Sequence, residues 1–249
     1  MNISDIKKEF PIFNNKVQNN DLVYLDSANS SQKPKIVVDR IYDFYTKEFS
    51  NVGRSVHYLA VAATNLYETT RTSVQKYINA KDKNEIVFTK GATEAINLVA
   101  NTFGQKYLSE GDEILLTELE HHSNYVPWDF LRKAKNIKIE FAEINQDGEI
   151  TLEAIEKKIT NKTKIISVTH LSNVTGAILP IKKIVELAHS KNIPVLIDGC
   201  QGAPHLKIDM QEIDCDFYAI SGHKMYGPTG IGVLYAKKKW LEDLPPYQG

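Results

Sequence analysis

Two ionisable side chains follow strongly apolar stretches of this sequence, an unusual position for groups that normally stay in water. Asp198 comes directly after Pro194–Ile197, and Lys224 comes shortly after Phe217–Ile220. A partly desolvated carboxylate needs a cationic partner, and a protonated pyridine nitrogen is one such partner. A lysine beside an apolar strand and other cations can lose its proton and attack an aldehyde. The simpler alternatives are a turn-capping aspartate and a solvated loop lysine.

Small and hydroxylated residues offer a place for a phosphate group. Gly91 and Thr93 lie where an apolar strand gives way to a helix, so free backbone N–H groups and a hydroxyl are available there. Ser221 and His223 flank Lys224 and add two further donors. Taken alone, the Gly91–Thr93 segment fits an ordinary helix cap better than a phosphate site.

Three more polar groups follow predicted strands. The pair His121–His122 has no third ligand at a spacing typical of a metal site, but one imidazole can stack on a planar ring. Asn173 has the amide needed to bind a ring hydroxyl or a carboxylate, although an asparagine in a turn is the simpler reading. Gln201 lies on the same turn as Asp198, within reach of a neighbouring ring substituent.

Together these groups match the needs of one cofactor. Pyridoxal 5'-phosphate requires a phosphate anchor, a stacking ring, a carboxylate for its pyridine nitrogen and a lysine for its aldehyde. Each requirement has a candidate at the carboxyl end of a predicted strand. The combination therefore indicates a site for this cofactor, with Lys224 as its covalent anchor.

The elements that must position these groups alternate regularly. Apolar runs predict strands over Val23–Leu25, Glu85–Thr89, Glu113–Thr117, Ile137–Phe141, Lys164–Thr169, Pro194–Ile197, Phe217–Ile220 and Gly232–Tyr235. Helical periodicity predicts helices over Pro34–Phe49, Ala62–Ile78, Thr93–Phe103, His122–Lys135, Leu152–Ile159 and Ile181–Ser190. This order predicts an α/β fold with a mostly parallel, seven-stranded sheet flanked by helices. In such sheets ligands bind beyond the carboxyl ends of the strands.

Composition narrows the class of protein. The 249 residues include 42% hydrophobic and 24% charged residues, with a net charge of −1. These values are ordinary for a globular protein, and the absence of a long basic run argues against nucleic acid as a partner. No apolar run is long enough to span a bilayer, so we expect no membrane partner. Two cysteines and no secretory signal over Met1–Phe10 indicate the cytoplasm.

The motifs, taken together, resemble those of the group II, SUF-type cysteine desulfurases. These enzymes belong to the class V aminotransferase-like branch of the fold type I pyridoxal-phosphate enzymes. The resemblance covers the whole chain and is carried by Tyr24–Ala28, Phe88–Asn97, Glu120–Asn124 with Val126–Trp128, Ser172–Val174, Asp198–Gln201 and Ser221–Gly232.

The resemblance implies a role for each candidate residue. Lys224 would hold the cofactor and move the proton at the substrate carbon, and His122 would stack on the ring and assist acid–base steps. The phosphate would be held by the Ala92 backbone, Thr93, Ser221 and His223. Asp198 would pair with the pyridine nitrogen, Gln201 would bind the ring hydroxyl, and Asn173 and Ala28 would contact the substrate. No metal site is expected.

The implied reaction converts L-cysteine to L-alanine and transfers the sulfur as an enzyme persulfide to an acceptor protein of iron–sulfur cluster assembly. The implied assembly is a homodimer. Family members run to roughly four hundred residues, so we expect a C-terminally truncated chain in which residues 1–30 belong to a largely missing small domain and 31–249 form the large cofactor domain. The nucleophilic cysteine loop would lie in the missing third.

Three alternatives stay open at this point. A selenocysteine lyase and another class V aminotransferase-like enzyme are alternatives to a cysteine desulfurase, because specificity between them lies largely in the missing third. The chain is also compatible with an inactive cofactor-binding fragment. Cys200 and Cys215 are poor candidates for the sulfur acceptor, because free cysteines next to buried strands usually behave as hydrophobic side chains.

Overall fold

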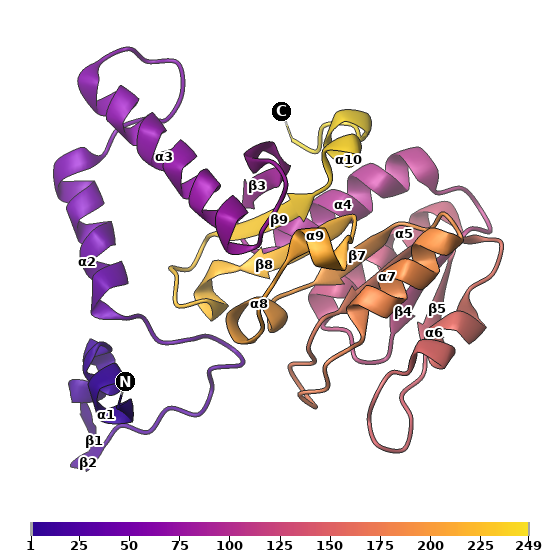
Figure 1. Cartoon of the computed structure of the whole chain (residues 1–249), viewed down its shortest axis with the longest axis horizontal. Coiled ribbons are helices and arrows are strands. Elements are labelled where there is room, and N and C mark those ends of the chain that lie inside the picture. Colours follow the sequence, from indigo (N-terminus) through magenta and orange to yellow (C-terminus); the bar gives the residue numbers. More distant parts are fainter. Residues whose placement is uncertain (1, 249) are drawn as a thin grey trace.

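A seven-stranded sheet forms the centre of the computed structural model, which describes residues 2–248 (Figure 1). Its strands are Ile86–Thr89 (β3), Glu113–Thr117 (β4), Lys138–Ala142 (β5), Thr163–Thr169 (β6), Val195–Asp198 (β7), Phe217–Ser221 (β8) and Gly232–Ala236 (β9). The order across the sheet is β3-β9-β8-β7-β6-β4-β5. Strands β5, β4, β6, β7 and β8 run parallel, and β9 is antiparallel to both of its neighbours. The predicted seven-stranded, mostly parallel α/β sheet is confirmed.

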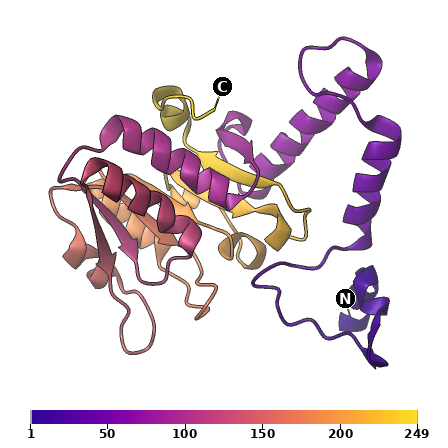
Figure 2. The same cartoon turned by 180° about the vertical axis from the view of Figure 1, so that it is seen from behind.

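Helices cover both faces of this sheet (Figures 1 and 2). One face carries Ala92–Tyr107 (α4), Val126–Lys135 (α5) and Lys238–Asp243 (α10). The other carries Tyr58–Tyr77 (α3), Leu152–Lys158 (α6), Ile181–Ser190 (α7), Gly202–His205 (α8) and Met210–Ile213 (α9). Single 3-10 turns lie at Lys83–Glu85 (η3), His122–Asn124 (η4) and Gly222–Lys224 (η5).

The core has two layers because the strands are buried on both sides. In β7, Val195 and Ile197 pack against the layer that contains α7, whereas Leu196 packs against the layer that contains α4. Successive side chains of a strand point to opposite faces, so a strand with helices on both faces must be apolar throughout. This explains why Val195–Ile197 of β7 is apolar throughout in the sequence.

The N-terminal part differs from the prediction. Val23–Leu25 is not a strand, and Val23 and Leu25 are 73% and 93% exposed. Within residues 2–248 no strand pairs with this segment, so its backbone N–H and C=O groups form no strand hydrogen bonds there. The elements found are Ile3–Lys8 (α1), Pro11–Asn14 (η1), Lys16–Val17 (β1) and Asn20–Asp21 (β2), and the helix predicted over Pro34–Phe49 divides into Lys35–Asp43 (α2) and a π-helical stretch, Phe44–Glu48 (η2).

The N-terminal part nevertheless reaches the loop that carries Lys224. The Ser31 backbone N–H and the Lys33 ammonium both donate to the carbonyl oxygen of His223, at 3.0 and 2.8 Å. The Phe10 ring lies 6.0 Å from the Tyr226 ring, centroid to centroid. These contacts hold the N-terminal part against His223 and Tyr226, on either side of Lys224 in the sequence.

A close backbone approach fixes the loop before α4. A side chain on Gly232 of β9 would have its Cβ only 2.5 Å from the Gly91 Cα. Only glycine permits this spacing. The start of α4 is therefore held against the antiparallel pair β3–β9, next to the end of β8.

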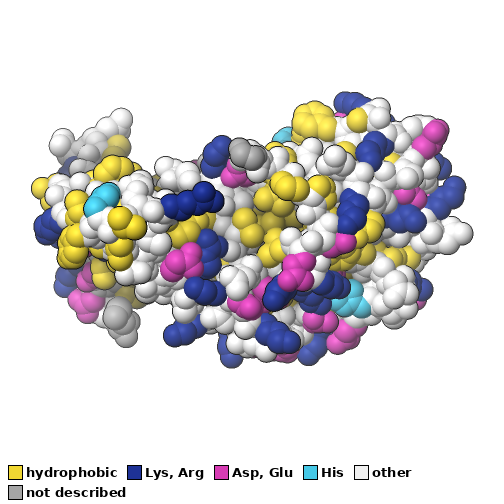
Figure 3. Space-filling view, turned by 90° about the horizontal axis from the view of Figure 1, so that it is seen from above, with side chains coloured by type: hydrophobic (Ala, Val, Ile, Leu, Met, Phe, Trp, Pro, Cys, Tyr) yellow, Lys and Arg dark blue, Asp and Glu magenta, His cyan; other side chains and the backbone are white. Residues whose placement is uncertain are grey.

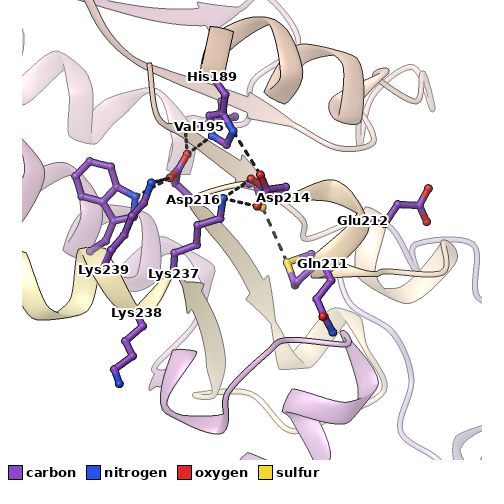
Figure 4. Close-up of polar contacts among 12 residues, drawn as sticks. His189, Val195, Gln211, Glu212, Asp214, Asp216, Lys237, Lys238 and Lys239 are labelled. Carbon is purple, nitrogen blue, oxygen red and sulfur yellow. Dashed lines mark hydrogen bonds and ion pairs between the residues drawn. The ribbon is translucent and has the colours of Figure 1, made fainter. Parts of the chain in front are cut away.

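A buried carboxylate, that of Asp216, connects several elements at the edge of the sheet where the parallel strands begin (Figure 4). Asp216, whose side chain is 1% exposed, accepts hydrogen bonds from His189 of α7 at 2.7 Å, from Trp240 of α10 at 2.7 Å and from the Val195 backbone at 3.0 Å. Burial alone would raise its pKa, but these bonds and the Lys239 ammonium hold the pKa well below its usual range. Asp216 therefore joins two helices on opposite faces to the start of β7.

We predict that Asp216→Asn lowers the free energy of unfolding by about 2–3 kcal/mol, because it removes a charged acceptor from several buried donors. Because the folded pKa is lowered, the stabilisation is complete above about pH 4 and is lost as the pH falls further. Urea unfolding at pH 7 and pH 3 measures both effects. Asp243→Asn is the control, since Asp243 forms an exposed ion pair with Lys106. Equal losses in the two variants would contradict this role for Asp216.

Candidate active site

One cavity lies at the carboxyl ends of the parallel strands, where the sequence analysis expected a site. It brings together eight of the predicted residues: Ala92, Thr93, Asn173, Asp198, Gln201, Ser221, His223 and Lys224. Six further residues complete its lining: Asn29, His121, Ser123, Thr169, Leu171 and Cys200. Segments from Asn29 to Lys224 therefore meet at one edge of the sheet.

Two predicted residues, His122 and Ala28, do not line this cavity. The imidazole at the cavity belongs to His121, whose Nδ1 accepts the Ser123 backbone N–H at 3.1 Å and so caps the turn η4. Burial lowers the pKa of His121, and the charges of Asp198 and Lys224 act on the same ring. The imidazole at the cavity is therefore that of His121, next to the predicted His122, and the ring-stacking role of His122 stays a prediction.

Asp198 is the deepest charged group of the cavity. It is the last residue of β7 and is 4% exposed. Its backbone is paired on both sides, with Thr169 of β6 and Ala219 of β8. Its Oδ1 accepts the Cys200 N–H at 3.0 Å. The carboxyl group is thus buried in the cavity lining and fixed in direction.

Lys224 ends η5, immediately after β8. The turn is tight, because the Gly222 N–H donates to the Ile231 carbonyl at 2.9 Å and the Gly227 N–H donates to the Gly222 carbonyl at 3.0 Å. A Cβ on Gly222 would lie 2.7 Å from the Ile231 side chain. Among residues 2–248 the Lys224 ammonium forms no ion pair within 4.0 Å. The amine is therefore available to a ligand in the cavity.

Hydroxyl groups gather near the start of α4. The Ala92 backbone N–H, predicted to face a phosphate, donates to Ser221 Oγ at 3.0 Å, and Thr93 Oγ1 lies 2.9 Å from Ser123 Oγ. No side chain caps the helix at Gly91. His223 Nδ1 lies 3.3 Å from Ser30 Oγ, on the N-terminal part of the chain. A helix start with three hydroxyls and an imidazole suits an anion.

The two amide side chains that line the cavity, those of Gln201 and Asn173, differ in how they are held. Gln201 Nε2 donates to the Ala28 carbonyl at 2.5 Å, so Ala28 takes part through its backbone by holding Gln201. Asn173 lies in an exposed turn in which Ser172 Oγ accepts the N–H groups of Val174 and Thr175. Asn173 is therefore the more accessible of the two to an incoming molecule.

Neither cysteine is an accessible thiol. Burial raises the pKa of Cys200 well above its usual value, and the neighbouring Asp198 charge raises it further. Cys215 is fully buried, and burial raises its pKa as well. Both side chains remain protonated at neutral pH, which makes them poor nucleophiles.

Residues 2–248 contain neither a metal-binding cluster nor a membrane-spanning helix. No group of three or more His, Cys, Asp or Glu side chains in this range is arranged to hold a metal ion. None of the helices found there combines the length and the apolar character that crossing a bilayer requires.

A half-buried acid, Glu120, joins two walls of the cavity, and sequence reasoning missed it. Its carboxylate accepts hydrogen bonds from the Thr117 hydroxyl at 2.6 Å, the Asn124 amide at 2.6 Å and the Thr169 backbone N–H at 3.0 Å. Burial raises its pKa to about 7, against the opposing effect of these bonds. The network holds the His121 turn against the end of β6. Its only signal in the sequence was a charged residue directly before the histidine pair.

We predict that the wild-type chain loses stability relative to Glu120→Gln as the pH rises from about 4.5 to about 7. Because the folded state holds this proton more tightly than the unfolded state, the loss reaches up to about 3 kcal/mol. Urea unfolding at pH 5 and pH 7.5 checks it. Glu118→Gln, an exposed neighbour, serves as control. A constant difference between wild type and Glu120→Gln across this range would show that Glu120 is ionised throughout.

The chain is similar to proteins named as cysteine desulfurases. It is 50% identical over 248 residues to a probable cysteine desulfurase of Halalkalibacterium halodurans, with all of this chain and 61% of the relative aligned. It is 47% identical to a cysteine desulfurase of Wigglesworthia glossinidia brevipalpis, covering 99% of this chain and 60% of the relative. The chain thus spans about 60% of the length of these relatives.

Solved structures show the same likeness. The fold matches the cysteine desulfurase CsdA of Escherichia coli with a TM-score of 0.89 and 39% identity, and covers 100% of this chain and 61% of that one. It matches the apo structure of a cysteine desulfurase of Thermococcus onnurineus NA1 with a TM-score of 0.93 and 36% identity, with 100% and 60% covered. The sheet and helices of this chain therefore have the same arrangement as those in the matched part of these two structures.

A family model gives the classification. The model described as aminotransferase class-V matches residues 23–249, nearly the whole chain. The match includes every residue that lines the cavity. On these grounds the chain belongs to the class-V aminotransferase family.

Proposed function

We propose that the cavity binds pyridoxal 5'-phosphate, and that the protein to which this chain corresponds is a cysteine desulfurase. The observation that carries the proposal is the meeting of a buried carboxylate, Asp198, and a lysine without an ion-pair partner, Lys224, in one cavity. A hydroxyl-lined helix start completes the donor set of this cofactor. The names of the similar proteins support the same conclusion.

Each cavity residue then has a defined task. Lys224 Nζ would hold the aldehyde carbon, and Asp198 would keep the pyridine nitrogen protonated. His121 would stack on the ring, and Gln201 would bind the ring hydroxyl. The phosphate would lie at the start of α4, among the hydroxyls of Thr93, Ser123 and Ser221 and beside His223. When bound, the cofactor supplies an electron sink for the substrate carbon next to nitrogen.

The chain's own residues would act on L-cysteine as follows. Asn173, in its exposed turn, would bind the substrate carboxylate, and Lys224 Nζ would remove and return the proton at the α-carbon. Sulfur would pass from the substrate to a thiolate as a persulfide, and L-alanine would leave. Cys200 and Cys215 are too deeply buried to be that thiolate. The accepting cysteine is therefore proposed to lie in the part of the relatives that this chain does not cover.

The assembly is proposed to be a homodimer. Apolar side chains are exposed along α2, in the loop before α3 and at the start of α3, among them Ile36 at 73%, Tyr42 at 67%, Val56 at 92% and Tyr58 at 84%. Figure 3 shows hydrophobic side chains gathered at the left of the view, where α2 and the start of α3 lie in Figure 1. Large exposed apolar surfaces of this kind are typical of interaction sites.

We also propose a cytoplasmic location, an acceptor protein of iron–sulfur cluster assembly, and a place for residues 1–30 in a second, smaller domain.

The proposal predicts that the purified chain takes up pyridoxal 5'-phosphate with a new visible absorbance that borohydride bleaches. Lys224→Ala abolishes this band, because no other amine lines the cavity among the described residues. Absorbance spectroscopy after removal of free cofactor is the measurement.

The matched control is Lys90→Ala, an exposed lysine just before Gly91 whose side chain is 80% exposed. It should keep the band. A band of equal strength in Lys224→Ala would refute the assignment of the covalent anchor, and no band in the wild-type chain would refute cofactor binding by this chain.

A further inference from the structure

A buried side-chain pair lies beneath the turn that carries Asp198 and Gln201. His170 Nδ1 and the Tyr218 hydroxyl are 2.8 Å apart, and both residues are buried, at 6% and 0% exposure. His170 follows β6 and Tyr218 belongs to β8, whereas β7 runs between them. The hydrogen bond therefore connects two strands that are not neighbours, across the end of the strand that separates them. We call this pair the His170–Tyr218 bridge.

The turn after β7 has no free space above this bridge. A Cβ on Gly199 would lie 1.9 Å from the Tyr218 ring, and a Cβ on Gly202 would lie 2.5 Å from His170 Nδ1. Real Cβ atoms do not approach other atoms so closely, so both positions require glycine or a displacement of the bridge. The backbone of the turn therefore rests directly on the two side chains.

Backbone hydrogen bonds hold the turn in the same place. The His170 N–H donates to the Asp198 carbonyl and the Gly199 N–H donates to the Ala219 carbonyl, both at 2.9 Å. Beyond the turn, the N–H groups of Ala203 and Leu206 donate to the carbonyls of Gly199 and Gly202 at 2.8 Å. The Cys200 N–H, which orients the Asp198 carboxylate, lies within this braced segment.

The bridge is uncharged. Burial lowers the pKa of His170 to about 4 and raises the pKa of Tyr218 well above its usual value. Both groups are therefore neutral at neutral pH, and the bridge makes a directional contact without adding charge beneath the cavity. The mechanism described above leaves both groups without a role, although each is buried and polar.

We propose that His170 and Tyr218 are positioning residues, and that their hydrogen bond sets the height and direction of the 198–202 turn. Through this turn it aims the Asp198 carboxylate and the Gln201 amide into the cavity. The effect on cofactor binding rests on the proposed function, whereas the effect on the turn itself does not.

The direct test is backbone hydrogen exchange, followed by mass spectrometry, of the cofactor-free chain. In Tyr218→Phe the ring stays and the hydroxyl is lost, so exchange over 199–206 should be roughly five- to tenfold faster. Exchange in β4 should not change. Tyr235→Phe is the control: Tyr235 is a buried tyrosine of β9 for which no side-chain hydrogen bond is found among the described residues.

A second variant disturbs the other residue of the bridge, His170. Gly202→Ala places a methyl group against His170 and should loosen the same segment. Unchanged exchange over 199–206 in both variants would overturn the proposal. An equal increase in every peptide would also overturn it, because it would mean general destabilisation and no local role.

A second readout uses pyridoxal 5'-phosphate as the probe. In Tyr218→Phe the cofactor should bind roughly tenfold more weakly, whereas Tyr235→Phe should bind it like the wild type. If the wild-type chain takes up no cofactor, the proposed function fails, and the exchange experiment still decides the role of the bridge. If cofactor binding is identical in all three chains, the bridge does not position the cofactor-binding groups.

Discussion

The structure depends on the cost of burying one negative charge, that of Asp198, at the end of a central strand. An ionised carboxylate at 4% exposure is costly unless hydrogen bonds and a cation offset the loss of water. In this chain one backbone N–H, from Cys200, points at it. The Lys224 ammonium lines the same cavity, and in the proposed function a protonated pyridine nitrogen would add a second cation. The neighbouring strands hold the backbone of Asp198 on both sides, and we propose that the His170–Tyr218 bridge fixes the turn that follows it.

Parallel topology explains why the other groups are present. Because β6, β7 and β8 run in the same direction, the residues after each of them meet at one edge of the sheet. Thr169, Asp198 and Lys224 thus come within reach of one ligand although they are far apart in the chain. The antiparallel pair β3–β9 adds the start of α4, which Gly232 allows to approach closely.

The regular part of the fold was predictable because the local pattern and the tertiary packing agree there. Helix α7 was predicted with its correct bounds, since its apolar stripe has a single buried face. The N-terminal part was not predictable in the same way. Its apolar residues, such as Leu25, are exposed, so an apolar run in that part did not mark a buried strand.

The site was predictable at the level of segments and less so at the level of single side chains. The motif around His121 and His122 was found, but the choice between two adjacent imidazoles depends on which one caps the turn η4. Glu120, His170 and Tyr218 were missed because each acts through a neighbour. Their role follows from hydrogen bonds between segments that are distant in the sequence, and no local pattern contains that information.

In the proposed function Lys224 is the amine that meets an aldehyde in this cavity. The most direct measurement is mass-spectrometric mapping of the peptides after the chain has been treated with pyridoxal 5'-phosphate and reduced with borohydride. We predict that nearly all of the pyridoxyl label is on Lys224. A label spread over exposed lysines such as Lys90, with Lys224 largely unmodified, would contradict it.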